Sequence, residues 1–130
     1  MLYKRRVQFY DTDAQGIVHH SNYFRYFEEA RGEFLRSLGL PYKTVREKGY
    51  EVVLLEACCN FKKPLLYDEL VEIELSLEEL DRFTFSFVYL VSVGGELRAE
   101  GRTKHCMVKG GKIVSVPQEI KDKLLTEIKA

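Results

Sequence analysis

Hydrophobic and polar residues alternate along much of the chain, which is the pattern of half-buried β-strands. The alternation is strict in 70–78, where every second residue is apolar and most of the residues between them are acidic. The other predicted strands are 2–9, 50–62, 83–93 and 96–108, and we expect 50–62, rich in Val, Leu and Cys, to be buried. Gly94 and Gly95 supply a hairpin turn between two of these strands.

From Tyr23 onward the apolar residues recur at the spacing of an α-helix. One stripe consists of Tyr23, Phe27, Ala30, Phe34 and Leu38. Gly39 and Pro41 end this helix. Its polar positions, which we expect to face solvent or partners, are Arg25, Glu28, Arg31 and Arg36. So broad an apolar surface predicts a helix held against a sheet.

Two shorter helices are also predicted. One covers 41–48 and ends at Gly49. The other is opened by Pro117 and carries an apolar side made of Ile120, Leu124, Leu125 and Ile128. The order of strand, long helix and then a run of strands predicts one α+β domain over residues 1–130, with the helix on one sheet face. The opposite face of 83–93 is small and apolar, so we expect a second subunit to cover it.

Composition excludes several classes of function. Lys and Arg total 20, as do Asp and Glu, so no global charge draws the protein to nucleic acid or to an anionic membrane. No apolar run is long enough to span a bilayer or to act as a signal peptide. Three cysteines, two of them adjacent, do not form a disulfide framework. We therefore expect a cytoplasmic protein with no membrane insertion.

The reactive side chains concentrate between the first strand and the long helix. Asp11, Asp13, His19 and His20 lie there, just before Ser21 and Asn22, which are favoured types for capping a helix. A carboxylate can act as a nucleophile or a general base, and free amides at a helix N-terminus can stabilise an oxyanion. Spacing alone favours a simpler role, in which the two aspartates form only turn hydrogen bonds. A metal site built from the four residues is chemically feasible, but no ligand spacing supports it.

Other charged residues have a structural explanation first. His105 is expected to be a hydrogen-bonded structural histidine, and Lys62, Lys63 and Arg82 are ordinary solvated charges. The alternative role of these three cations is to bind phosphates.

The motif Asp11-Thr12-Asp13-Ala14-Gln15-Gly16-Ile17-Val18-His19-His20-Ser21-Asn22-Tyr23, followed by Tyr26-Phe27-Glu28-Glu29-Ala30-Arg31, resembles the signature of hot-dog-fold acyl-CoA thioesterases. The 4-hydroxybenzoyl-CoA thioesterase type and the Tol-Pal-associated acyl-CoA thioesterases are the most similar branches. The resemblance implies a single hot-dog domain, in which a five-stranded antiparallel sheet wraps a long central helix. It also implies edge-to-edge pairing of subunits in dimers or tetramers, with active sites at the interface.

The same resemblance implies roles for individual residues. Asp13 matches the catalytic carboxylate, while Asp11 supports the loop. His20 matches a histidine implicated in catalysis in the Tol-Pal-associated branch. In the hydroxybenzoyl branch the backbone N–H at this position points at the thioester oxygen. Asp13 is therefore expected to act as nucleophile or general base, with helix N-terminal amides polarising the carbonyl.

Coenzyme A enters this prediction as part of the substrate, and no other cofactor and no metal is expected. Arg82 matches a coenzyme A-binding position, although Asp81 replaces a second arginine of the hydroxybenzoyl branch. Lys62 and Lys63 are alternative coenzyme A-binding residues, suggested by their location only. The predicted function is hydrolysis of an acyl-CoA to a free acid and coenzyme A. The alternatives are a hot-dog acyl-thioester hydratase or dehydratase, and a non-catalytic module that binds acyl-CoA or acyl-carrier protein.

Overall fold

The structure, a computed structural model, describes residues 1–127. Its strands are β1 (Leu2–Arg6), β2 (Glu51–Phe61), β3 (Leu70–Leu80), β4 (Thr84–Val93), β5 (Glu96–Lys109) and β6 (Lys112–Val114). Its helices are the short 3-10 helix η1 (Phe9–Asp11), α1 (Ser21–Ser37), α2 (Tyr42–Glu47) and α3 (Gln118–Leu125). None of the helices in the described residues is long and apolar enough to cross a membrane.

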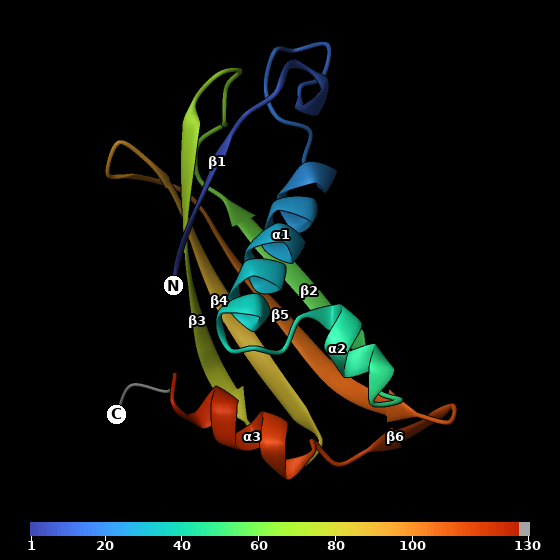
Figure 1. Ribbon diagram of the computed structural model, residues 1–130. Coiled ribbons are helices and arrows are strands. Elements are labelled where there is room, and N and C mark those ends of the chain that lie inside the picture. The colour runs from blue at the N-terminus through green and yellow to red at the C-terminus, as the bar shows by residue number, and fades with distance from the viewer. Residues whose placement is uncertain (128–130) are drawn as a thin grey trace.

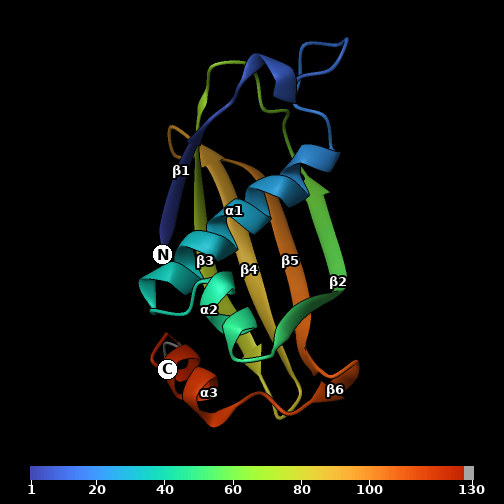
Figure 2. The ribbon, with the colours of Figure 1, turned by 45° about the vertical axis from the view of Figure 1, so that its right-hand side comes forward.

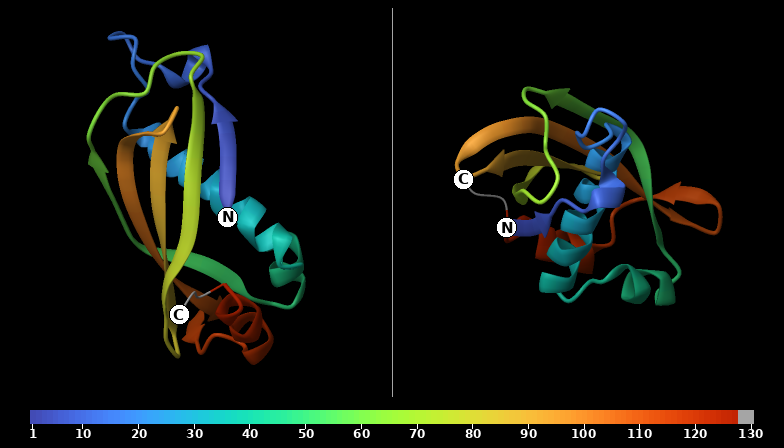
Figure 3. Two further views of the ribbon diagram at one scale, coloured as in Figure 1. Left: turned by 90° about the vertical axis from the view of Figure 1, so that its left-hand side faces the viewer. Right: turned by 90° about the horizontal axis from the view of Figure 1, so that it is seen from above.

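The strands form one antiparallel sheet in the order β1-β3-β4-β5-β2, and the short β6 pairs with β5. The long helix α1 lies against one face of this sheet (Figures 1 and 2). The strands curve around the helix, as the view from the side in Figure 3 shows. The predicted α+β class and the predicted hot-dog arrangement of one helix and five strands are confirmed, and β6 is an addition to them.

The alternating residues of the two central strands build the core, as their pattern predicts. Val71, Ile73 and Leu75 of β3 are at most 1% exposed. On β4 the residues facing the helix are aromatic or β-branched and buried: Phe85, Phe87, Tyr89 and Val91. The apolar stripe of α1 covers them, so burial of both apolar faces holds the helix on the sheet.

A side chain of the helix packs directly against the backbone of β5 at Gly101, which has no side chain. The ring of Phe27 stacks on Tyr89 with ring centroids 4.3 Å apart. A Cβ atom placed on Gly101 would lie 2.3 Å from Cζ of Phe27, well inside van der Waals contact. Gly101 is therefore required by the packing of α1 on the sheet.

Several expectations are corrected. The strand predicted at 50–62 is not buried: β2 is an edge strand paired only with β5 among the described residues, and its Leu54 and Leu55 are about half exposed. Arg31, expected on the outer surface of the helix, is only 8% exposed. It follows Phe27 by four residues, so it lies on the buried face. The first strand ends at Arg6 rather than at residue 9. Ile128 lies outside the described residues.

Candidate active site

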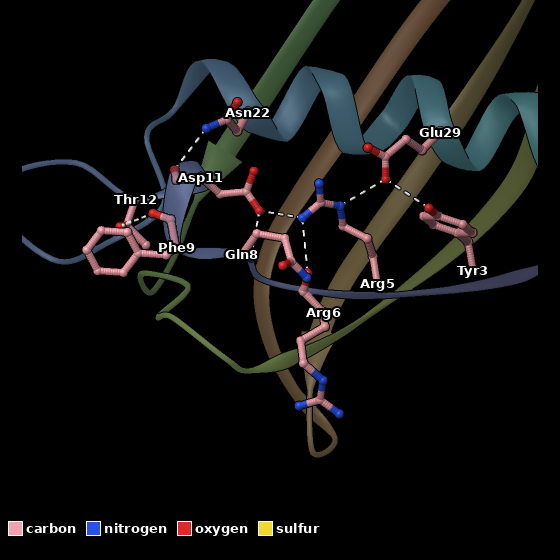
Figure 4. Close-up of polar contacts among 9 residues, drawn as sticks. All are labelled: Tyr3, Arg5, Arg6, Gln8, Phe9, Asp11, Thr12, Asn22 and Glu29. Carbon is pink, nitrogen blue, oxygen red and sulfur yellow. Dashed lines mark hydrogen bonds and ion pairs between the residues drawn. The ribbon is translucent and has the colours of Figure 1, made fainter.

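The loop between β1 and α1 is anchored by Asp11, whose side chain is buried. Its carboxylate forms an ion pair with Arg5 and accepts the backbone N–H of Gln8 at 2.8 Å. Its backbone carbonyl accepts the N–H of His19 at 3.0 Å and the side-chain amide of Asn22 at 2.8 Å. Asp11 thus joins the strand before the loop to the helix after it (Figure 4), and these contacts agree with the supporting role expected from the resemblance.

Arg5 extends this anchor to the middle of α1. Its Nε donates to Oε1 of Glu29 at 3.0 Å, and the same oxygen accepts the hydroxyl of Tyr3 at 2.8 Å (Figure 4). The guanidinium carbon lies 4.4 Å from the centre of the Tyr26 ring. Two carboxylates and an aromatic face therefore neutralise Arg5, which leaves this cation a structural role.

Asp13 occupies a tight turn in which only part of its carboxylate is used. The backbone N–H of Asp13 donates to Ile17, and that of Gly16 donates back to Asp13 at 3.0 Å. Gly16 has a φ of 80°, a conformation that favours glycine. Oδ1 of Asp13 accepts the N–H of Gln15 at 2.8 Å, whereas no donor in residues 1–127 contacts Oδ2. The turn bonds predicted from spacing exist, and one carboxylate oxygen stays available for chemistry.

The start of α1 differs from the expectation. Ser21 and Asn22 do not cap the helix but are its first residues. The N-cap residue is His20, whose side chain forms no capping hydrogen bond. Nδ1 of the preceding His19 accepts the backbone N–H of Ser21 at 3.2 Å and lies 2.8 Å from the Ser21 hydroxyl. The N–H of Asn22 donates to the carbonyl of His19. Amides expected to be free are therefore occupied, while the N–H of His20 has no acceptor within residues 1–127.

An open cleft of about 420 Å³ brings most of the predicted site residues together. It is lined by Asp13, Gln15, Ile17, Val18, His20, Tyr23, Phe61, Lys62, Lys63 and Pro64. Tyr23 and Phe61 meet edge to face with ring centroids 4.8 Å apart, so they form an apolar wall of the cleft. Burial raises the pKa of the Tyr23 phenol, which keeps it neutral at physiological pH. The cleft therefore combines an apolar surface with a carboxylate and an imidazole.

Arg98 holds the loop that forms the second wall of this cleft. Its guanidinium pairs with Glu69 at 2.9 Å and donates to the carbonyl of Pro64 at 2.8 Å. Its backbone carbonyl accepts the N–H groups of Lys62 and Lys63. The hydrogen bond from Arg98 lowers the pKa of Glu69, so the pair stays ionised at neutral pH.

The three predicted coenzyme A-binding cations are not equivalent. Nζ of Lys63 is 2.8 Å from Oε2 of Glu96, so this lysine is paired. Lys62 has no carboxylate partner in the described part of the chain. Arg82 is not in the cleft: its carbonyl accepts the N–H of Val116, and the turn between β3 and β4 lies at the opposite end of the sheet (Figure 1). Within one chain, only the two lysines lie at the cleft.

Spacing in the sequence gave no sign of the Arg5 and Glu29 anchor, because these residues are 24 positions apart and meet only through the fold. Gln15 was a missed lining residue of the cleft, although it stands inside the motif that carries the resemblance. His105 is buried and lies 2.9 Å from Oγ1 of Thr103, which confirms its structural role. Within residues 1–127, no group of three or more His, Cys, Asp or Glu side chains is placed to hold a metal ion.

Comparison with known proteins identifies the family. The model of the thioesterase-like superfamily matches residues 7–124. A protein of Aquifex aeolicus with a provisional description as an esterase is 66% identical over 119 residues, which cover 92% of this chain and 93% of that protein. An acyl-CoA thioesterase of Haemophilus influenzae is 29% identical over 119 residues, covering 89% and 88% of the two chains.

Solved structures agree with the sequence matches. The structure of a gentisyl-coenzyme A thioesterase is 32% identical, covers 95% of this chain and 99% of its own, and has a TM-score of 0.90. The resemblance inferred from the loop and the predicted enzyme class, a thioester hydrolase, are confirmed. The residues that the family model matches include both walls of the cleft. This chain therefore belongs to the thioesterase-like superfamily.

Proposed function

We propose that the protein hydrolyses acyl-CoA thioesters to a free acid and coenzyme A, with Asp13 as nucleophile or general base. One observation supports this proposal: the cleft is lined by Asp13, whose Oδ2 has no donor within residues 1–127, and by His20, whose backbone N–H has no acceptor there, and both lie beside an apolar surface. An acyl chain can lie against Tyr23 and Phe61 while its carbonyl reaches the polar end.

Hydrolysis of a thioester needs a nucleophile or general base and a donor for the oxyanion. Either Oδ2 of Asp13 or a water molecule that it deprotonates adds to the thioester carbon, and the N–H of His20 stabilises the resulting oxyanion. The carbon–sulfur bond then breaks, and sulfur leaves with the electron pair. Because a thiol has a pKa near 8.5, coenzyme A leaves as a thiolate without a strong general acid. The His20 imidazole lines the same cleft, where it orients the substrate or relays a proton.

Coenzyme A and the second subunit belong to the same proposal. Lys62 at the cleft is placed to attract a phosphate, whereas Arg82 would contribute only from another subunit. The exposed apolar residues Leu54 and Leu55 on the edge strand β2 support pairing with a second copy, as a dimer or as part of a tetramer. A cytoplasmic location is also part of the proposal.

The two alternative functions differ from hydrolysis in what they release. Acyl-CoA esters from short aliphatic to long-chain and aromatic should be tested for thiol release, and 2-enoyl-CoA for loss of the enoyl absorbance. Hydrolysis predicts thiol release in proportion to product acid. A hydratase removes the enoyl absorbance without releasing thiol, and a binding module does neither, so either result would refute the proposal.

Labelled water separates the two roles of Asp13. In a single turnover in oxygen-18 water, label in the Asp13 carboxylate supports direct attack and an acyl-enzyme whose anhydride opens at the Asp13 carbon. An unlabelled Asp13 with labelled product acid excludes that route and leaves two others: a water molecule activated by the carboxylate, or an anhydride that opens at the acyl carbon. Mass spectrometry of the peptide that contains Asp13 provides the measurement.

A further inference from the structure

A second cleft, of about 430 Å³, opens between α1, α2 and β2. Its lining residues include Arg31, Tyr42, Arg46, Leu54 and His105. It lies on β2 near Glu51, whereas the first cleft contains Phe61 at the other end of this strand. The two clefts therefore lie toward opposite ends of one exposed sheet edge.

Arg31 is a buried cation without a counter-ion in the described part of the chain. It is 8% exposed, and no carboxylate of residues 1–127 lies within ion-pair distance of it. Its Nη1 donates to the hydroxyl of Tyr89 at 3.1 Å, while its Nε is buried and has no hydrogen-bond partner. A buried charge that lacks an opposite charge is costly, so this guanidinium is suited to bind an anion.

The groups beside Arg31 do not supply the missing negative charge. The Tyr89 hydroxyl lies 2.5 Å from Oγ1 of Thr103, which in turn is 2.9 Å from Nε2 of His105. Burial and the nearby charge of Arg31 lower the pKa of His105 to about 3, so this imidazole is neutral at physiological pH. The network is polar but uncharged apart from Arg31.

The charged groups at the mouth of the cleft leave Arg31 unpaired. Arg46 lies 3.9 Å from Glu51, so these two largely offset each other in solvent. Glu28 also lines the cleft and is exposed to solvent, where its charge is screened. The buried part of the cleft therefore presents a positive charge among apolar and phenolic side chains.

Pairing of β2 with a second β2 brings the two kinds of cleft together. In an antiparallel pair, the Phe61 end of one strand lies beside the Glu51 end of the other. Both clefts lie between α1 and β2, so they open on the same side of the sheet. The second cleft of one protomer then continues the first cleft of its partner, away from the thioester.

We infer that Arg31 of one protomer binds a carboxylate at the far end of the acyl group that is hydrolysed in the partner's first cleft. The preferred substrates are then acyl-CoA thioesters whose acyl group ends in a carboxylate. This inference rests on the proposed hydrolysis and on the pairing through β2, and it names the substrate class. A charge-assisted hydrogen bond to a buried guanidinium is strong enough to set such a preference.

The test compares matched substrates that differ at the far end only: 4-carboxybenzoyl-CoA against 4-methylbenzoyl-CoA, and adipoyl-CoA against hexanoyl-CoA. The ratio of kcat/KM within each pair is measured by thiol release, so the fraction of active enzyme cancels. Wild type should favour at least one carboxylate substrate, and Arg31→Gln should lower that ratio about tenfold or more. Arg31→Lys should retain part of it, and the exposed Arg36→Gln should leave it unchanged.

A second variant keeps the test valid if Arg31→Gln fails to fold. Tyr42 lines the second cleft from α2 and is only partly buried, so Tyr42→Glu places a carboxylate there without changing β2. It should lower the same ratio. Equal ratios in wild type, Arg31→Gln and Tyr42→Glu would overturn the inference while leaving hydrolysis intact, whereas no thiol release from any acyl-CoA would refute the proposed function itself.

Free adipate and terephthalate distinguish a substrate carboxylate from a separate ligand. If calorimetry shows that wild type binds them through Arg31 but the substrate ratios are equal to one, the cleft takes a separate carboxylate, and the assignment to the acyl group is wrong. Inhibition by these acids that is competitive toward only the carboxylate substrates supports the assignment to the acyl group.

Discussion

The side-chain amide of Asn22 donates a hydrogen bond of 2.8 Å to the backbone carbonyl of Asp11. This bond closes the loop that carries Asp13 and His20, because Asn22 is in the first turn of α1 and Asp11 ends η1. The same carbonyl accepts the N–H of His19, so both ends of the loop meet at one oxygen. The position of Asp13 therefore depends on a contact outside the cleft.

Asn22→Ala removes this contact. We expect the free energy of unfolding to fall by about 1 kcal/mol, since Asp11 keeps its bond from His19. We also expect a lower kcat at temperatures where the protein is fully folded, because the loop loses its tie to α1. Urea unfolding and thiol release provide the measurements. Glu33→Gln, an exposed change further along α1, is the control, and equal kcat values in the two variants would contradict this account.

Asp11→Asn tests the ion pair with Arg5, in which the side chains are only 4% and 15% exposed, respectively. Arg5 keeps its ion pair with Glu29, but a charge-assisted hydrogen bond in a buried site is lost, so we expect a loss of about 2 kcal/mol in the free energy of unfolding. The matched control is Arg36→Gln, which breaks an exposed pair with Glu33 and should cost less than about 1 kcal/mol. Similar losses in the two variants would show that the buried Asp11–Arg5 pair stabilises the protein no more than an exposed ion pair does.

Gly101→Ala tests the close contact between α1 and the sheet. The added methyl group would overlap the Phe27 ring, and we expect a loss of about 1–3 kcal/mol in the free energy of unfolding. Combining it with Phe27→Leu should cost less than the sum of the single changes, because the smaller side chain gives the methyl group room. Additive losses, measured by urea unfolding, would argue against the overlap.

His105 makes stability depend on pH. Its pKa is lowered from 6.5 to about 3 in the folded protein, so the unfolded chain takes up the proton first. This contribution is complete above pH 6.5 and is lost as the pH falls toward 3, with a slope of at most about 1.4 kcal/mol per pH unit. Urea unfolding between pH 6.5 and 5 should show a smaller slope for His105→Gln than for wild type. An unchanged slope would contradict burial of a neutral imidazole.

The residue pattern predicted the fold well where one physical cause dominates. Strict alternation in β3 placed Val71 and Ile73 in the core, and helical spacing identified α1, because burial of apolar side chains sets both periods. The motif predicted that Asp13 and His20 share a site, and the cleft unites them. Composition could not show that β2 is an edge strand, since an apolar edge strand can have the same residues as a core strand.

Interactions between distant residues set the limits of prediction. Its charge predicts a surface position for Arg31, because charged side chains usually face solvent, yet helical spacing from Phe27 places it on the buried face. The hydrogen bond from the Ser21 N–H to His19 depends on the backbone path of the loop, which residue type does not reveal. The anchor through Arg5 and Glu29 exists only once β1 lies beside α1.

The kcat of Asp13→Asn is the most direct test of the central claim. The substitution keeps the shape of the side chain and can still accept the Gln15 N–H, so the free energy of unfolding should stay within about 1 kcal/mol of wild type. Thiol release from the best acyl-CoA substrate should fall by about 100-fold or more, because the amide can neither attack the thioester nor take a proton from water. A folded Asp13→Asn variant with the kcat of wild type would contradict the account.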